Sequence, residues 1–163
     1  MFKKQVIYNL SIIFFIFFLD RISKIYILNF FEMKNIAEVS LNSFINIILV
    51  WNTGIGFGLF QLDQTSAYNF ITFIILIINL IIVYLLFIEK RINKFFLSMI
   101  LGGSLGNFYD RIVYSAVPDF IDLNYNGYHW FVFNVADIFI SIGILILIFL
   151  ELFKINKNEK KYN

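Results

Sequence analysis

Cysteine is absent from the 163-residue sequence, and histidine and proline occur once each, as His129 and Pro118. The absence of cysteine excludes disulfide bonds, a thiolate nucleophile and metal sites built on cysteine. A single histidine argues against a histidine-rich metal site, so we expect no metal and no other cofactor. Charged residues make up only 15% of the chain, and a net charge of +2 is too small to indicate a nucleic-acid partner.

Apolar residues are abundant instead. They make up 60% of the chain, aromatic residues make up 20%, and 22 residues are phenylalanine. A soluble domain of this length cannot bury so much apolar surface, so lipid must cover part of it. The length favours one membrane-embedded domain over residues 1–163.

Four segments are apolar over the roughly 20 residues that a membrane-spanning helix needs. The sequence therefore predicts an α-helical integral membrane protein with transmembrane helices at about 6–28, 68–88, 95–113 and 133–153. The first segment follows basic residues like a cleavable signal, but Asp20 and Arg21 follow its apolar run where small residues would mark a cleavage site. We interpret it as a retained helix.

The distribution of lysine and arginine predicts the orientation. Nine of these residues fall at 3–4, 90–94 and 154–161, whereas four fall on the opposite side of the predicted helices. The positive-inside rule then places both termini in the cytoplasm and residues 29–67 and 114–132 outside, as expected for a multi-pass protein of a bacterial inner membrane.

The two outward segments differ in composition. Residues 44–51 and 57–60 are short β-type runs, which predict a small extracytoplasmic β-sheet forming a cradle on the membrane surface. Residues 114–132 are rich in aromatic residues, which favour the boundary between water and lipid. For these periplasmic segments we also expect a loop with one short helix.

Ionisable residues gather at one end of the predicted helices. Charge at bilayer depth costs at least about 2.5 kcal/mol per residue, so each such residue needs a reason. With the predicted orientation the following residues all lie near the outer ends: Asp20, Arg21, Lys24, Asp110, Arg111, Asp119 and Asp137. This one-sided clustering predicts an outward-facing polar site.

Asp119 and Asp137 are the best candidates for chemistry within this cluster. Asp119 is expected in the outward loop and Asp137 in the first turn of the fourth helix, and a short loop between antiparallel helices can bring them together. Two close carboxylates share a proton, so one can activate water while the other hydrogen-bonds a scissile carbonyl. The positive end of the helix favours the Asp137 anion, which suggests Asp137 as the base and Asp119 as the acid.

Structural alternatives exist for these charged residues. Asp137 follows Asn134 by three residues, as in a helix cap, and Asp119 alone is most often a loop carboxylate. Asp20 and Lys24 are spaced as an ion pair on one helix face. Asp110 and Arg111 can be an adjacent pair at the membrane surface.

Alternatives also exist for the remaining polar residues and the glycines. Gly102, Gly103 and Gly106 favour helix packing, and Asn52 to Gly54 can be an ordinary turn. We expect Asp63 and Asp122 to be solvated loop charges. Asn79 is expected to bond a neighbouring helix, and His129 to lie at the membrane interface. Ser23 and Lys24 are a rival catalytic dyad, but neighbouring residues point apart on a helix.

Five motifs, in order along the chain, resemble those of bacterial lipoprotein signal peptidases (signal peptidase II). Residues 20–24 (DRISK) resemble Asp-x-x-x-Lys, and residues 52–58 (NTGIGFG) resemble Asn-x-Gly-x-x-Phe followed by Ser or Gly. Residues 102–111 (GGSLGNFYDR) are similar to Gly-Gly-Ala-x-Gly-Asn-x-x-Asp-Arg. Residues 117–120 (VPDF) and 133–137 (FNVAD) resemble the motifs that hold the two catalytic aspartates. Ser104, Ile55 and Gly56 depart from the usual residues, which affects substrate fit only.

This resemblance implies an aspartyl endopeptidase that cleaves prolipoproteins on the amino side of a diacylglyceryl-modified cysteine. Asp119 and Asp137 would be catalytic. The resemblance implies substrate-binding or supporting roles for Asp20, Lys24, Asn52, Gly54, Gly103, Asn107, Asp110, Arg111, Asn134 and Ala136. It also implies inhibition by globomycin-type cyclic peptides, and nothing in the sequence demands more than one copy.

Two other functions compete with this one. A small transporter or channel component would relay protons or cations through the aspartates, but it would place charge near mid-membrane, and the middles of helices one, two and four carry none. A structural partner that docks through residues 102–106 would leave the polar clustering unexplained.

Overall fold

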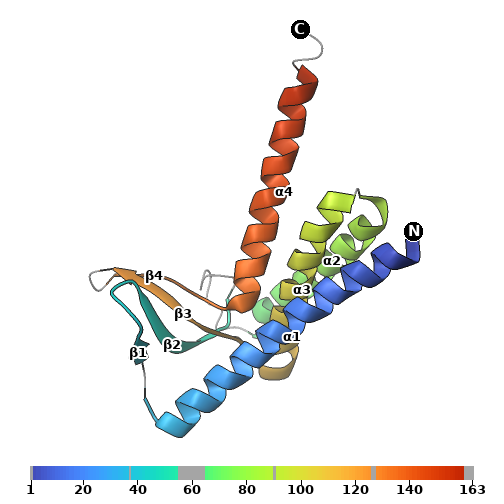
Figure 1. Ribbon diagram of the computed structural model, residues 1–163. Helices are drawn as coiled ribbons and strands as arrows, with labels where there is room; N and C mark the ends of the chain where they lie inside the picture. Colours follow the sequence, from blue (N-terminus) through green and yellow to red (C-terminus); the bar gives the residue numbers. More distant parts are fainter. Residues whose placement is uncertain (1, 37, 55–64, 90, 126–127, 160–163) are drawn as a thin grey trace.

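The computed structural model describes residues 2–36, 38–54, 65–89, 91–125 and 128–159. Its long helices are α1 (Phe2–Lys34), α2 (Thr65–Ile88), α3 (Arg91–Tyr114) and α4 (Val135–Glu159). All four predicted helices are present, each extended by a few residues at one or both ends. The first turn of α1, the α2–α3 turn and the last turn of α4 all point away from the sheet (Figure 1).

Three helices within the described residues are long and apolar enough to cross a membrane. Their candidate spans are Lys3–Lys34, Tyr68–Ile88 and Val135–Phe153. The third helix, α3, is less apolar because it carries glycines, Asn107 and Asp110, and it packs against α1, α2 and α4. Membrane crossing is therefore supported for three helices, and for α3 it stays a prediction.

Helix α1 continues well beyond its predicted end at residue 28. Asp20 and Lys24 were expected at the outer end of this helix, but ten residues of α1 follow Lys24. The helix does not need to end at these charges because Asp20 is paired with Arg21 and Lys24, and Lys24 is also paired with Asp110 of α3. Its 33 residues span about 50 Å, against a hydrocarbon core of about 30 Å. The last turns, at Ile27 and Phe31, pack on Phe120 of the sheet.

The sheet has four strands in the order β1-β2-β3-β4, each antiparallel to its neighbour: β1 (Glu38–Ser40), β2 (Ile45–Asn52), β3 (Val117–Tyr125) and β4 (Tyr128–Phe133). The predicted small sheet is confirmed, and the strand expected at 44–51 corresponds to β2. The strand expected at 57–60 lies outside the described residues.

The prediction that residues 114–132 form a loop was wrong, because β3 and β4 occupy most of this segment. The backbone of β3 pairs with β2 on one side and, from Ile121 onward, with β4 on the other, so its hydrogen bonds are made within a sheet. The described parts of 29–67 and 114–132 contain no separate short helix, so the expected loop-helix is not found there.

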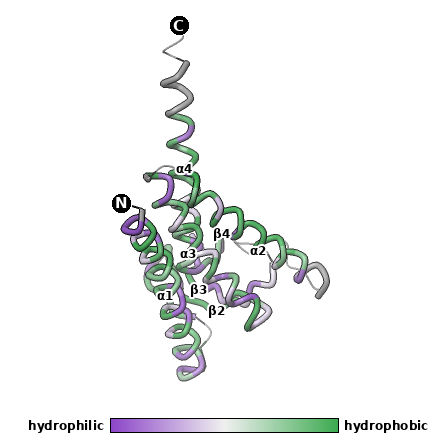
Figure 2. The backbone as a smooth tube through the Cα atoms, turned by 90° about the vertical axis from the view of Figure 1, so that its right-hand side faces the viewer, coloured by the Kyte–Doolittle hydropathy of each residue, from purple (hydrophilic) through white to green (hydrophobic). Residues whose placement is uncertain are grey.

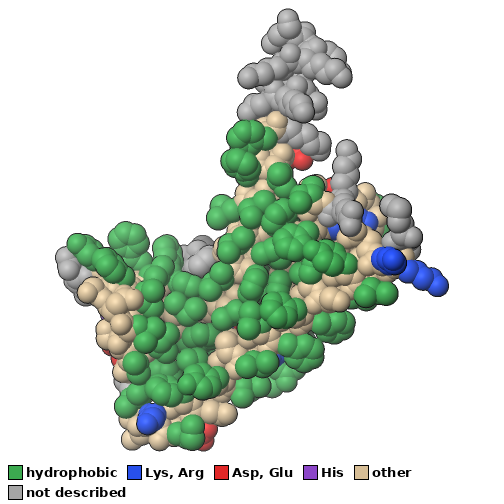
Figure 3. Space-filling view, in the orientation of Figure 1, with side chains coloured by type: hydrophobic (Ala, Val, Ile, Leu, Met, Phe, Trp, Pro, Cys, Tyr) green, Lys and Arg blue, Asp and Glu red, His purple; other side chains and the backbone are tan. Residues whose placement is uncertain are grey.

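Apolar side chains fill the bundle and also cover its outside. The buried cluster of Ile13, Ile82, Leu97, Ile100 and Leu101 joins α1, α2 and α3. Figure 2 shows hydrophobic positions along most of α2 and hydrophilic positions at the start of α1. In Figure 3 hydrophobic side chains cover most of the visible face of helices and sheet. Exposed apolar surface on this scale requires a lipid environment.

Close helix contacts occur at the glycines of α3. A Cβ at Gly102 would lie 2.9 Å from the Ile13 carbonyl oxygen of α1, and one at Gly103 would lie 2.6 Å from the Ala136 carbonyl oxygen of α4. Both distances are shorter than van der Waals contact. The packing interpretation of these glycines is confirmed: only glycine lets α3 approach both helices so closely.

Replacing Gly103 with alanine is expected to destabilise the protein. The new methyl group meets a helix backbone oxygen that cannot move by itself, so α3 and α4 must separate, at a cost of about 1–3 kcal/mol. Thermal unfolding in detergent should show a lower midpoint for Gly103→Ala. The adjacent change Ser104→Ala, at a half-buried position, should have little effect. Equal midpoints for the two variants would contradict this account of the contact.

Candidate active site

The two predicted catalytic aspartates come from different elements and share one partner. Asp119 lies on β3 and Asp137 in the first turn of α4. Asn134, which directly precedes α4, donates from Nδ2 to Asp119 Oδ1 at 2.6 Å and from its backbone N–H to Asp137 Oδ2 at 3.1 Å. A single residue thus holds both carboxylates, whose residues are only 2% and 8% exposed.

Asn134 and Asp137 also cap α4. The Asn134 Oδ1 accepts a hydrogen bond from the Asp137 N–H at 3.1 Å, while Asp137 Oδ2 accepts from the Asn134 N–H. This reciprocal arrangement satisfies two N–H groups at the helix start. The capping interpretation is confirmed. It is compatible with catalysis because the cap uses only Oδ2 of Asp137 and leaves Oδ1 outside the cap.

Asp119 was expected in a loop, but it lies on strand β3 and is buried. It pairs with Val50 across the β2–β3 ladder, and β4 joins β3 only from Ile121 onward. The first residues of β3, including Pro118, therefore pair with β2 but not with β4. Asp119 lies where the sheet meets α4.

The second partner of Asp119 comes from β2. Asn52 donates from Nδ2 to Asp119 Oδ2 at 2.8 Å, and its Oδ1 accepts the Gly54 N–H at 2.8 Å. The turn predicted at these residues is present, and it orients the Asn52 amide toward the aspartate. The Gly54 carbonyl in turn accepts a hydrogen bond from Arg111 Nη2.

Arg111 does not pair with Asp110, so the interpretation of an adjacent ion pair was wrong. Its guanidinium lies 5.4 Å from the centroid of the Tyr68 ring, and the Tyr68 hydroxyl donates to the Arg111 carbonyl at 3.0 Å. Two buried donors of Arg111, Nε and Nη1, have no partner in the described part of the chain.

The other partner of Asp137 leads to a charged cluster. Asn107 of α3 donates from Nδ2 to Asp137 Oδ1 at 2.8 Å, and its Oδ1 accepts from Lys24 Nζ at 2.7 Å. Lys24 also donates to Asp20 Oδ2 at 2.9 Å and to Asp110 Oδ2 at 2.7 Å. The ion pair expected between Asp20 and Lys24 therefore exists, but within a larger network.

Arg21 completes this ion cluster, which we define as Asp20, Arg21, Lys24 and Asp110. Its two terminal nitrogens lie 2.5 Å from Asp110 Oδ1 and 2.7 Å from Asp110 Oδ2, and Nη2 also lies 3.0 Å from Asp20 Oδ2. Asp20, Lys24 and Asp110 are 0% exposed. Two positive and two negative charges face one another, which is what burial at this depth requires.

The ion cluster also holds the start of α4. Asp20 Oδ1 accepts the backbone N–H of Ala136 at 3.1 Å, and Ala136 is 0% exposed. The carbonyl of Ala136 is the group that faces Gly103. All ten predicted supporting residues therefore belong to one contiguous site with the two aspartates, through hydrogen bonds or direct packing.

The sequence placed Arg21 in the outward polar cluster without giving it a supporting role, and it gave no indication of Tyr68. The signal for Arg21 was its place beside Asp20 at helix depth, since a buried arginine there needs a carboxylate. Tyr68 begins the predicted second helix and has no motif around it. Only the contact between α2 and α3 reveals its role.

Three other polar residues lie outside this site. Asp122 was expected to be solvated, but it is 0% exposed on β3, with Oδ2 at 2.7 Å from His129 Nδ1. The side chain of His129 is half exposed, in keeping with an interfacial position. Asn79 was expected to bond a neighbouring helix, yet neither of its side-chain polar atoms has a partner in the described residues. Asp63 lies outside the described residues.

Burial sets the protonation of Asp119. Loss of hydration raises the pKa of this carboxyl from 3.8 to about 7, and the nearby negative charge of Asp137 acts in the same direction. The hydrogen bonds from Asn52 and Asn134 oppose this shift. A pKa of about 7 makes both the protonated and the ionised form of Asp119 accessible near neutral pH. No cluster of three or more potential metal ligands occurs in the described part of the chain.

Comparisons with known proteins identify the family of this chain. The family model described as signal peptidase (SPase) II matches residues 12–153. A lipoprotein signal peptidase of Pelagibacter ubique (strain HTCC1062) is 48% identical over 160 residues, covering 98% of this chain and 96% of that protein. A lipoprotein signal peptidase of Francisella tularensis subsp. novicida (strain U112) is 43% identical over 126 residues, covering 74% and 78%.

Two solved structures share the fold. Both are described as bacterial membrane enzymes. One superimposes with a TM-score of 0.72 at 30% identity, covering 92% of this chain and 90% of that one. The other gives a TM-score of 0.68 at 29% identity, covering 88% and 92%.

The raised pKa of Asp119 predicts how stability changes with pH. A carboxyl that holds its proton more tightly in the folded state stabilises the protein below its unfolded pKa, and this contribution is lost as pH rises through about 7. The midpoint temperature of thermal unfolding of the wild type should therefore fall from pH 5 to pH 8, relative to that of Asp119→Asn, in which residue 119 cannot titrate. Parallel pH profiles for the two proteins would show that Asp119 titrates in its ordinary range.

Proposed function

We propose that this chain, which belongs to the signal peptidase II family of aspartic peptidases, removes signal peptides from prolipoproteins with Asp119 and Asp137 as its catalytic pair. The observation that carries the proposal is the pair itself: two buried carboxylates from β3 and α4, both hydrogen-bonded to Asn134. Carboxylates held this close share a proton, which supplies one base and one acid at neutral pH.

In the first step Asp137 acts as the base. Its carboxylate takes a proton from water, and the resulting hydroxide oxygen bonds to the carbonyl carbon of the scissile peptide. Asp119 gives its proton to the carbonyl oxygen, which forms a neutral tetrahedral diol. The positive end of α4 and the donors on Asn134 and Asn107 support the Asp137 anion, while burial keeps Asp119 protonated in part.

In the second step the roles reverse. Asp137 returns its proton to the leaving nitrogen, Asp119 takes the proton of one diol hydroxyl, and the carbon–nitrogen bond breaks. The products are a carboxylic acid and an amine, and both aspartates regain their starting states. Metal and covalent intermediates are not needed in this scheme, which consumes only water.

Arg111 is a candidate contact for the substrate backbone. Its Nη2 donates to the Gly54 carbonyl, whereas buried Nε and Nη1 have no partner in the described residues. An unpaired buried donor costs about 1–3 kcal/mol, and a peptide carbonyl would remove that cost. Asn52 and Asn134 then hold the Asp119 carboxyl oriented toward the same peptide.

The position of the pair suits a membrane-embedded substrate. Asp137 lies two residues into the candidate span that begins at Val135, so it is near a membrane boundary. We propose that this boundary is the outer one, with both termini cytoplasmic, because nine lysine and arginine residues lie on the opposite side. A diacylglyceryl-modified cysteine would place its scissile bond at this depth, and one copy of the chain contains all the residues used. Globomycin-type peptides would bind at the same pair.

Asparagine at either aspartate should abolish cleavage. Asp119→Asn removes the acid and Asp137→Asn removes the base, and each loss should lower the cleavage rate by at least about 10²–10⁴-fold. The measurement is release of signal peptide from a lipid-modified prolipoprotein by purified protein, with and without EDTA. Asp122→Asn is the matched control, because it changes another buried carboxylate on the same strand and should keep activity. Full activity in either catalytic variant would rule out the pair, and loss of activity in EDTA would point to a metal.

The lipid on the substrate cysteine should be required. An exposed apolar surface where β2 and α3 end includes Trp51 and Tyr114, whose rings lie 5.7 Å apart, and such a surface favours an acylated peptide. With the same prolipoprotein sequence, the unmodified-cysteine form should be left uncut while the diacylglyceryl form is processed. Equal rates on both forms would show that the peptide alone is recognised.

A further inference from the structure

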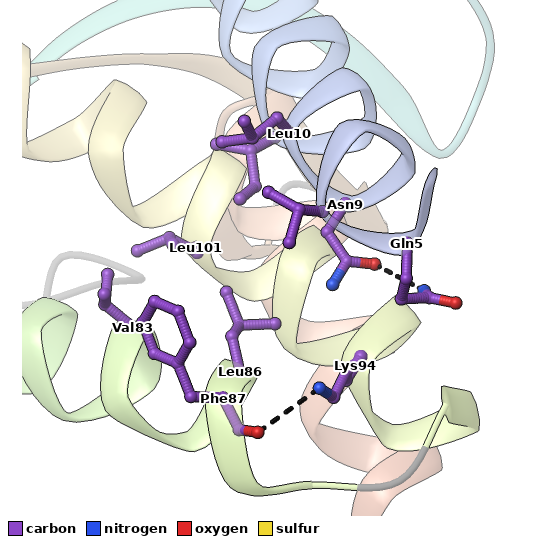
Figure 4. A pocket seen from close by; sticks show the side chains of 10 residues that line it. Gln5, Asn9, Leu10, Val83, Leu86, Phe87, Lys94 and Leu101 are labelled. Atoms are coloured by element: carbon purple, nitrogen blue, oxygen red, sulfur yellow. Dashed lines mark hydrogen bonds between the residues drawn. The ribbon is translucent and has the colours of Figure 1, made fainter. Parts of the chain in front are cut away.

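A cavity of about 160 Å³ lies between α1, α2 and α3, at the ends of these helices that are remote from the aspartates (Figure 4). Its walls are mainly apolar and include Leu10, Ile13, Val83, Leu86, Phe87 and Leu101. Asn9 and Asp20 are separated by about 16 Å along α1 from the helical rise, so the cavity is not part of the catalytic site. Apolar cavities of about 150 Å³ hold small hydrocarbons.

Two hydrogen-bond donors stand at one end of this cavity. Asn9 is only 8% exposed; its Oδ1 accepts from Gln5 Nε2 at 2.9 Å, and its amide nitrogen is directed between Leu86 and Lys94 (Figure 4). Lys94 Nζ donates to the Phe87 carbonyl at 3.4 Å, which is a long bond. An amide nitrogen and an ammonium group can only donate, so a matching ligand must present acceptor oxygens there.

The charge around this end is mainly positive. Lys3 and Lys4 are exposed in the first turn of α1, next to Gln5 of the cavity lining. Glu89 is the acidic residue at the α2–α3 turn, and its carboxylate accepts from Asn93 Nδ2 at 2.9 Å. Acceptor oxygens that carry negative charge therefore fit this end better than neutral ones.

We propose that this cavity binds a segment of one acyl chain of an anionic phospholipid, with the lipid phosphate and ester oxygens held by Lys94 and Asn9. Along α3, Lys94 and Leu101 are about 10 Å apart from the helical rise, so a chain can extend from the donors into the apolar part. The donors lie at the helix ends, where phospholipid headgroups are found, and basic residues there attract anionic lipids. The proposal does not depend on the peptidase mechanism.

The test counts lipids bound to the purified full chain. The delipidated protein is titrated with phosphatidylglycerol, and separately with phosphatidylcholine of the same acyl chains, and native mass spectrometry measures the first binding event. The wild type should bind one phosphatidylglycerol molecule, and it should bind phosphatidylcholine several-fold more weakly. Lys94→Gln should reduce the preference for phosphatidylglycerol roughly five-fold, as expected for one basic residue. Lys34→Gln, at the far end of α1, should not change it.

Filling the cavity is the second arm of the test. Val83 lines the cavity and is 39% exposed, so Val83→Phe can occupy the space without disturbing the core, and it should weaken binding of both lipids at least tenfold. Leu10→Phe is a second filling variant, and Val113→Phe is the matched control on the outer half of α3. Circular dichroism and gel filtration confirm folding of each variant. Equal binding of the two lipids by the wild type, or wild-type binding in both filling variants, would overturn the proposal.

Discussion

Four formal charges held inside an apolar bundle impose the main constraint on this fold. Asp20 and Lys24 are unexposed on α1, and Asp110 is unexposed on α3, so each needs a partner of opposite charge within contact distance. Arg21 supplies the second positive charge, with two short contacts to Asp110. Removing one member of a buried pair typically costs about 3–5 kcal/mol. Any backbone arrangement that separates α1 from α3 by even a few ångströms would incur such a cost, so the register of these helices is determined by the charges.

The same cluster determines where Asp119 and Asp137 lie. Asp20 uses one oxygen for the positive charges and the other for the N–H of Ala136, which fixes the first turn of α4 against α1. A Cβ at Gly106 would lie 2.5 Å from Asp20 Oδ2, so glycine there is what lets the carboxylate reach both partners. The positions of Asn134 and Asp137 follow from the placement of α4. Asn134 then holds the start of β3 against α4 through its hydrogen bond to Asp119. The contacts that pack the helices together therefore also set the geometry of the candidate active site.

The helices were predictable because their apolar runs are long, and the proximity of Asp119 to Asp137 was predictable because a short segment joins two antiparallel helices. The strands β3 and β4 were missed, although Asn-Gly at 126–127 between two aromatic-rich runs is a hairpin signal. Asp122 was misjudged because burial of a strand residue depends on which face meets the protein, and one sequence does not show this. The continuation of α1 past Lys24 was missed for a related reason: charge ends a membrane helix only when it is unpaired, and the partners of Lys24 come from α3.

Asn107 connects the ion cluster, whose charges sum to zero, to Asp137. Lysine only donates hydrogen bonds, so the Asn107 atom that faces Lys24 must be oxygen. The other end of the amide is then the NH₂ group, and it points at Asp137. Because an amide polarised by a cation is a better donor, Lys24 supports the ionised form of Asp137 at one remove, although its own charge is balanced by Asp20 and Asp110. The hydrogen-bond partners of Asp119 are the amides of Asn52 and Asn134. The hydrogen-bond partners of the two carboxyls therefore differ, because among them only those of Asp137 lead through an amide to a charged side chain.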